Sequence, residues 1–265
     1  MGKLAAIYRK ELQHYFQSTI AYVMIGSFLA LSGYFFFSIF RYYNYLSYQY
    51  NNYLSNQAPG SGSYPGDTLN LIEGVMRPLM GNMSVVLLFV LPLLTMRLLA
   101  EERKQGTFEL LLTYPLSDLA AVMGKYLAAL TVCAAMIAGT LLYPAMLAIF
   151  SNPEPGPIIT SYFGLFLMGT SFIAIGIFFS SITTSQIVAG AATFGVSLFF
   201  LVIGWASPFA GPTLAKVIAQ FSLLDHYDSF SKGIISLPDV TYYVFLTAFF
   251  LFMTLRSLES SHWRS

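Results

Sequence analysis

Residues 158–180 read IITSYFGLFLMGTSFIAIGIFFS and contain no Asp, Glu, Lys or Arg. A helix of about 20 such residues is long enough to cross the hydrocarbon core of a bilayer. Further stretches have the same character, and their uncharged cores lie at about 20–40, 79–96, 126–150, 187–205 and 240–255. The sequence therefore predicts six transmembrane helices.

The composition of the whole chain supports this prediction. Of its 265 residues, 56% are hydrophobic and only 9% are charged, whereas soluble domains carry about 25% charged residues. So few charges cannot cover a water-exposed surface, and most of the outer surface must face lipid. The apolar run that begins at Ile20 is too long for a cleaved signal peptide, so we expect this segment to be retained.

The predicted fold class is therefore an all-α polytopic membrane protein with a single transmembrane domain over 1–265. With their flanks, the predicted helices cover 20–40, 79–100, 123–150, 158–180, 187–205 and 239–256. The segments between them are two outer loops at 41–78 and 206–238 and an inner segment at 101–117.

The distribution of Lys and Arg predicts the orientation. Cytoplasmic loops carry an excess of these residues, and an even number of spans places both termini on one side. That side holds nine of the 13 cations, and the other side holds Arg41, Arg77, Lys216 and Lys232. We therefore expect both termini in the cytoplasm; that the membrane is a bacterial inner membrane is implied by the resemblance described below.

Two segments outside the spans have a membrane-related pattern. Residues 3–17 place Leu4, Tyr8 and Leu12 at four-residue spacing beside basic residues, which predicts a helix lying in the headgroup layer. The outer loop at 206–238 is too polar to cross twice, but it could enter partway as a re-entrant hairpin where protein satisfies its backbone.

The sequence motifs give little support for an enzymatic activity or a metal site. Ser229 and Lys232 form an S-x-x-K pattern, yet its companion motifs are absent from the sequence. The three His and the single Cys133 lack metal-ligand spacing, so no metal site and no disulfide framework are predicted. Gly190–Ser197 resembles a phosphate-binding loop but has Val196 in place of the essential lysine. No catalytic residue, cofactor or nucleic-acid partner is predicted for this chain.

The small residues around Gly190 and Gly195 instead predict close packing of the helix at 187–205 against another helix.

The inner segment is the most distinctive part of the sequence. Residues 101–117 read EERKQGTFELLLTYPLS. Gly106 permits a sharp turn, Phe108, Leu111 and Leu112 form one apolar face, and Pro115 ends the short helix. Ser117 is then a suitable N-cap for the next span. A short helix with an apolar face among charges has nothing in its own chain to cover it, which predicts a docking site for another protein.

This stretch closely resembles the signature of ABC type-2 transporter permeases, and the resemblance covers nearly the whole chain. YRKEL at 8–12 resembles the N-terminal elbow helix of the family. His226, Phe230, Gly233 and Ile234, followed by Asp239, resemble its segment before the last helix. Within the family, the chain is most similar to the gliding-motility-associated and nitrous-oxide-maturation-like permeases.

The resemblance implies an ABC type-2 exporter fold with an elbow helix at 3–17 and a re-entrant hairpin before the sixth span. It implies two ATP-binding subunits that supply ATP and Mg, a second permease copy or homologous permease, contact with membrane lipid, and an optional auxiliary membrane protein with an extracytoplasmic domain.

The implied site residues fall in three groups. The coupling region that docks on the ATPase contains Glu101, Glu102, Arg103, Gly106, Thr107, Phe108, Glu109, Leu111, Leu112 and Pro115. The elbow helix contributes Arg9, Lys10 and Glu11, and the outer re-entrant segment contributes Asp225, His226, Lys232, Gly233 and Asp239. An ATP-independent carrier and a membrane scaffold remain the alternatives to an ATP-driven exporter.

Overall fold

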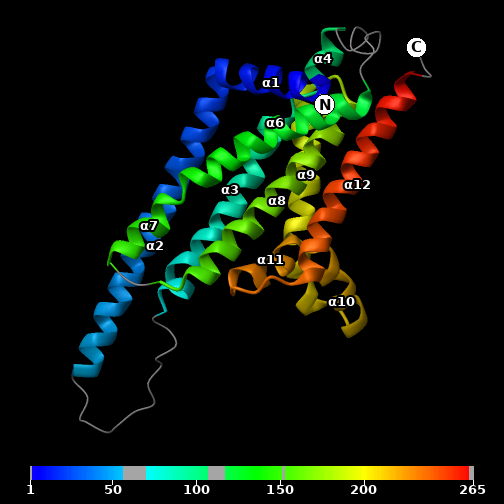
Figure 1. Cartoon of the computed structure of the whole chain (residues 1–265). Coiled ribbons are helices and arrows are strands. Elements are labelled where there is room, and N and C mark those ends of the chain that lie inside the picture. Colours follow the sequence, from blue (N-terminus) through cyan, green and yellow to red (C-terminus); the bar gives the residue numbers. More distant parts are fainter. Residues whose placement is uncertain (1, 56–69, 107–116, 151–152, 263–265) are drawn as a thin grey trace.

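The computed structural model describes residues 2–55, 70–106, 117–150 and 153–262 (Figure 1). The regular structure of these residues is entirely helical, and six helical segments are long and apolar enough to cross a membrane. The predicted all-α fold class and its six spans are thus confirmed. The candidate spans are Thr19–Tyr53, Ile72–Lys104, Asp118–Ile149, Pro155–Ile182, Gln186–Phe209 and Leu237–Ser260.

The elements follow one another in simple order along the chain. They are α1 (Gly2–Gln17), α2 (Thr19–Ser55), a π-helical turn (Ile72–Met76), α3 (Arg77–Thr95), α4 (Ala100–Lys104), α6 (Asp118–Gly139), α7 (Leu142–Phe150), α8 (Pro155–Ile182), α9 (Gln186–Val202), a 3-10 turn (Ile203–Phe209), α10 (Pro212–Phe221), α11 (Leu223–Ser231) and α12 (Leu237–His262).

Helix α8 forms the centre of the bundle. It packs against α3, α6, α9, α11 and α12, and 78% of its most apolar window is buried, against 17% for α2. A helix that is apolar on all sides is suited to such a position. The uncharged stretch at 158–180 is therefore the helix around which the others assemble.

Helix α1 lies across one end of the bundle rather than along it, and both chain ends lie at that same end (Figure 1). A bend at Ser18 separates α1 from α2. The prediction of a separate N-terminal helix at 3–17 matches α1, while its place in the headgroup layer stays a prediction.

The predicted span at 123–150 is divided in the structure. Helix α6 ends at Gly139 and α7 begins at Leu142, because Pro144 lacks the N–H that a continuous helix would donate to the Thr140 carbonyl. That carbonyl accepts instead from the Tyr143 N–H at 3.0 Å and from the Tyr162 hydroxyl of α8 at 2.9 Å. A local turn and a neighbouring helix thus satisfy the break together, as is required inside a membrane.

The two predicted outer loops contain more helix than expected. Helix α2 continues to Ser55, well into the predicted loop at 41–78, and it includes the six tyrosines between Tyr42 and Tyr53. The segment at 206–238 forms α10 and α11, with a turn at Gly233, whose φ of 86° favours glycine. Both helices lie at the end of the bundle opposite to α1 (Figure 1). The entry of this segment into the membrane as a re-entrant hairpin stays a prediction.

The orientation can be tested with two exposed positions at opposite ends of the bundle. Gln105 follows α4, and Thr213 lies in α10. The native Cys133 is buried and should react little. With both termini in the cytoplasm, Thr213→Cys should react with an impermeant thiol reagent in intact cells, whereas Gln105→Cys should react only after permeabilisation. Labelling of both from the same side would contradict the six-span topology.

Candidate functional site

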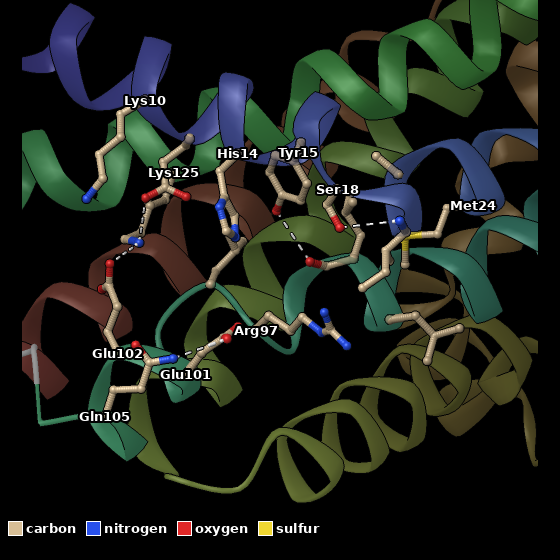
Figure 2. A pocket seen from close by; sticks show the side chains of 16 residues that line it. Lys10, His14, Tyr15, Ser18, Met24, Arg97, Glu101, Glu102, Gln105 and Lys125 are labelled. Carbon is tan, nitrogen blue, oxygen red and sulfur yellow. Dashed lines mark hydrogen bonds and ion pairs between the residues drawn. The ribbon is translucent and has the colours of Figure 1, made fainter.

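A buried lysine joins three elements at the N-terminal end of the bundle. The Lys125 Nζ of α6 lies 2.9 Å from Glu11 Oε1 of α1 and 2.8 Å from Glu102 Oε1 of α4 (Figure 2). Only 3% of the Lys125 side chain is exposed. A charge buried to this extent is stable only when paired, so the two carboxylates and the ammonium hold each other in place.

Helix α1 approaches α6 closely enough to make this contact because Gly124 has no side chain. A Cβ at Gly124 would lie 2.7 Å from Ile7 Cγ2. The Tyr8 hydroxyl also lies 3.0 Å from Thr131 Oγ1 of α6. The contact places Glu11 on the half-buried face of α1, while Arg9 and Lys10 remain exposed.

Tyr15 attaches the end of α1 to α3. Its hydroxyl donates to the Leu94 carbonyl at 3.3 Å. Burial, and to a smaller extent the charge of Glu11, raises the pKa of the Tyr15 phenol above its usual value. The phenol therefore keeps its proton and remains a hydrogen-bond donor at all physiological pH values.

Helix α4 is positioned by Ser180, a residue that the sequence did not indicate. The Leu99 and Ala100 backbone N–H groups both donate to Ser180 Oγ of α8 at 3.0 Å, and Ser180 donates to the Met96 carbonyl at 3.1 Å. These bonds satisfy backbone groups that the end of α3 and the start of α4 leave unpaired. The central helix α8 thus fixes the direction of α4 and with it the position of Glu102.

The predicted coupling region is only partly described. Gly106 has a φ of 70°, which agrees with a sharp turn after α4, and the Ser117 side chain caps α6 by accepting from the Ala120 N–H. Arg103 is half-buried, and Glu101 accepts a bond from Gln105. The remaining predicted contact residues lie outside the described residues: Thr107, Phe108, Glu109, Leu111, Leu112 and Pro115.

A pocket of about 340 Å³ opens beside the Lys125 cluster, between α1, the start of α2 and the end of α3 (Figure 2). Its lining has two parts. One part is charged, and the other is apolar and comes from α2 and α3. The charged part contains Lys10, Glu11, His14, Arg97, Glu101, Glu102 and Lys125, and the apolar part contains Ile20, Ala21, Met24, Leu93, Leu94 and Leu98.

At the opposite end of the bundle, the structure brings two predicted residues together. His226 Nδ1 of α11 lies 2.7 Å from Asp239 Oδ1 of α12, and the His226 ring stacks on Tyr242 with centroids 4.1 Å apart. Asp225 is at the start of α11, where Ser222 caps its backbone N–H. The pair joins α11 to α12.

Lys232 of the predicted outer segment forms an ion pair. It pairs with Asp228, which also binds Arg77 at the start of α3. Burial alone would raise the pKa of the Asp228 carboxyl, but the hydrogen bonds and charges of Lys232 and Arg77 outweigh it and lower the pKa below its ordinary value. Asp228 therefore stays ionised and joins α11 to α3.

Metal binding is also unsupported within the described residues, which contain no group of three or more His, Cys, Asp or Glu side chains placed to hold an ion. Glu11 and Glu102 were among the candidate residues that the sequence indicated, whereas Lys125 contributed only to the count of cations that predicts the orientation. The available signal was a lysine about two turns after the start of α6, a helix whose other charged residue is Asp118 at its first position, because a cation inside a membrane helix needs a partner.

Comparisons with known proteins agree with this architecture. A family model described as ABC-2 family transporter protein matches residues 5–257. Over 140 residues, the chain is 28% identical to the probable multidrug ABC transporter permease YbhR of Escherichia coli strain K12, and equally to that of strain O157:H7. The alignment covers 51% of this chain and 37% of the relative. The chain, a multi-pass membrane protein, therefore belongs to the ABC-2 transporter family.

Proposed function

We propose that this chain is the membrane subunit of an ATP-driven exporter and that a separate cassette subunit hydrolyses the ATP. The observation that carries the proposal is the Lys125 cluster. It joins the elbow helix α1, the first part of the coupling region and a membrane span through one buried cation. A structural unit of this kind can transmit a displacement of the cytoplasmic segment directly to the membrane helices.

The anchors of α4 determine which membrane helices a displacement of this segment would reach. The helix is bound at its start by Ser180 of α8 and at Glu102 by Lys125 of α6. A partner that moves the segment at 101–117 would therefore act on the central helix and on α6 together. ATP can drive transport in this way only if the closed ATPase binds one arrangement of these helices more tightly than another.

Two cassette subunits and two membrane subunits form the proposed complex, with membrane lipid around it and an optional auxiliary protein outside. Export is proposed because the E. coli relative is named a probable multidrug ABC transporter permease. Phe108, Leu111 and Leu112 supply the proposed apolar contact with the ATPase, and Glu101, Glu102, Arg103 and Glu109 supply its polar contacts. ATP and Mg²⁺ bind in the partner.

Alanine substitutions in the proposed contact should separate anchors from peripheral residues. Truncating a central apolar anchor of an interface typically costs about 2 kcal/mol or more, whereas a charge at the rim costs less. Phe108→Ala and Leu111→Ala should therefore strongly reduce copurification of the ATPase, and Lys104→Ala should reduce it only slightly. The measurement is the amount of cassette subunit retained on the tagged membrane chain.

ATP hydrolysis and transport in proteoliposomes complete this test. The chain alone should hydrolyse no ATP, and its complex with the cassette subunit should. If both anchor variants retain the ATPase and transport at the parental rate, the docking assignment is wrong. Transport by the chain without any ATPase would favour a secondary carrier, and a complex that never transports would favour a scaffold.

A further inference from the structure

The pocket beside the Lys125 cluster has the lining of a phospholipid site. Its buried apolar part includes Ala21, Met24 and Leu94, and this surface continues outward to Ile20 and Leu93, which are 38% and 50% exposed. An apolar wall that leads from a charged pocket to the lipid-facing surface suits a molecule with a polar head and an acyl chain. A soluble anion would leave this wall uncovered.

The charges of the pocket divide into a satisfied set and an open set. Lys125, Glu11 and Glu102 neutralise one another in the buried cluster. Arg97 makes no ion pair with another described residue, although Glu101 lies one helical turn away, and Figure 2 shows its guanidinium turned away from Glu101. Lys10, at the rim, is likewise exposed and unpaired among the described residues.

The charge count of the lining predicts the headgroup. Three cations (Lys10, Arg97 and Lys125) face three anions (Glu11, Glu101 and Glu102), so with His14 neutral the net charge is zero. A guanidinium binds phosphate through two parallel hydrogen bonds. The Glu101 carboxylate accepts one bond from Gln105 and has further lone pairs that can accept from a primary ammonium. Arg97 lies in the turn between α3 and α4, where its carbonyl accepts from the Glu101 N–H at 3.3 Å, and the phosphate and ammonium of an ethanolamine headgroup are separated by two carbons.

We infer that this pocket binds a phosphatidylethanolamine-type phospholipid from the leaflet on the α1 side of the membrane. Arg97 holds its phosphate, Glu101 holds its primary ammonium, and Leu93 and Ile20 contact the start of an acyl chain. Glu101 is also assigned to the proposed ATPase contact, but the lipid site can be tested without the ATPase, because it concerns the membrane chain by itself.

Native mass spectrometry of the delipidated full chain tests this site with three lipids of equal chain length. Phosphatidylethanolamine should bind more tightly than phosphatidylcholine, which has no N–H donor, and more tightly than anionic phosphatidylglycerol. Arg97→Gln should weaken binding of all three about tenfold, as expected for the loss of a charge-assisted pair to phosphate. Glu101→Gln should abolish the preference for phosphatidylethanolamine and leave phosphatidylcholine binding unchanged.

Controls and competitors define the outcomes. Lys216→Gln and Glu154→Gln each remove one exposed charge outside the pocket lining and should leave lipid binding unchanged. Soluble glycerophosphoethanolamine should fail to displace the lipid, and displacement at equal concentration would show a site for free headgroups instead. Equal binding of the three lipids to the parent, or parental binding by Arg97→Gln, would overturn the inference. Because no ATPase is present, these results leave the proposed coupling untouched.

Discussion

Replacing Lys125 with Met is expected to destabilise the folded chain by about 3–5 kcal/mol, because it leaves two carboxylates buried without their cation. The Lys125 side chain is 3% exposed, and those of Glu11 and Glu102 are 12% and 19% exposed. Such a loss should markedly lower the unfolding temperature of the purified chain in detergent. Lys232→Met is the matched control, because the Lys232 side chain is 50% exposed.

A compensating variant can separate the destabilisation caused by unpaired charges from the destabilisation caused by lost packing. In Glu11→Met/Lys125→Met/Glu102→Met, no charge remains in the cluster, and replacement of a buried ionic group by well-packed apolar residues of similar volume is often neutral or stabilising. We expect this triple variant to recover most of the stability that Lys125→Met loses. It should nevertheless couple ATP hydrolysis to transport poorly, because α1, α4 and α6 are no longer joined.

Equal stability of the single and triple variants would show that the charges are solvated and that the cluster does not bear on folding. Parental coupling in the triple variant would assign transmission to other contacts, with Ser180 as the next candidate. The two readouts, unfolding temperature and the ratio of transport to hydrolysis, therefore test the structural and the functional role of the cluster separately.

The spans were predictable because the bilayer imposes a simple requirement. Each crossing segment must satisfy its backbone internally and carry apolar side chains, and 158–180 meets both conditions within one uninterrupted stretch. The same requirement explains why the division of 123–150 was missed. A hydropathy average does not register that Pro144 interrupts a helix. Tyr162, whose hydroxyl bonds to the carbonyl at the break, comes from a different span.

The site was less predictable than the fold. Glu11, Glu102 and Lys125 lie in three separate parts of the chain, and no spacing rule relates them. Hydropathy places Lys125 near a membrane boundary, where a cation ordinarily reaches water. Only the packing of α1 across α6, which Gly124 permits, turns this residue into a buried partner of two carboxylates.

Close packing of small residues was expected on the helix at 187–205, and the structure supports this for one glycine of the pair. A Cβ at Gly190 would lie 3.3 Å from Met96 Sδ at the end of α3, whereas nothing lies within 4 Å of the corresponding position at Gly195. The tightest contact is elsewhere. A Cβ at Gly176 of α8 would lie 2.0 Å from Thr95 Oγ1 and 2.6 Å from Thr95 Cβ.

Gly176→Ala should therefore be strongly destabilising for a change of one methyl group. Overpacking of a core typically costs roughly 1–3 kcal/mol, and this contact should lie at the upper end because Thr95 is fully buried and its hydroxyl is bonded to the Leu91 carbonyl at 2.9 Å. Gly195→Ala is the matched control. Its space is open, and alanine is favoured over glycine in a helix by up to about 1 kcal/mol, so its unfolding temperature should stay the same or rise.

The effect of Gly176→Ala should also extend to the coupling region. Ser180 lies one turn after Gly176 on α8, and it binds the backbone that links Thr95 to α4. Separating α3 from α8 at Gly176 should lengthen these bonds and release α4, so hydrolysis by the assembled complex should lose its link to transport. Thr95→Ala in the same chain removes the two outer atoms of the clash and should restore part of both properties. Unfolding temperatures and coupling ratios that match the parent in Gly176→Ala would show that α3 and α8 separate without cost, and that Ser180 does not fix α4.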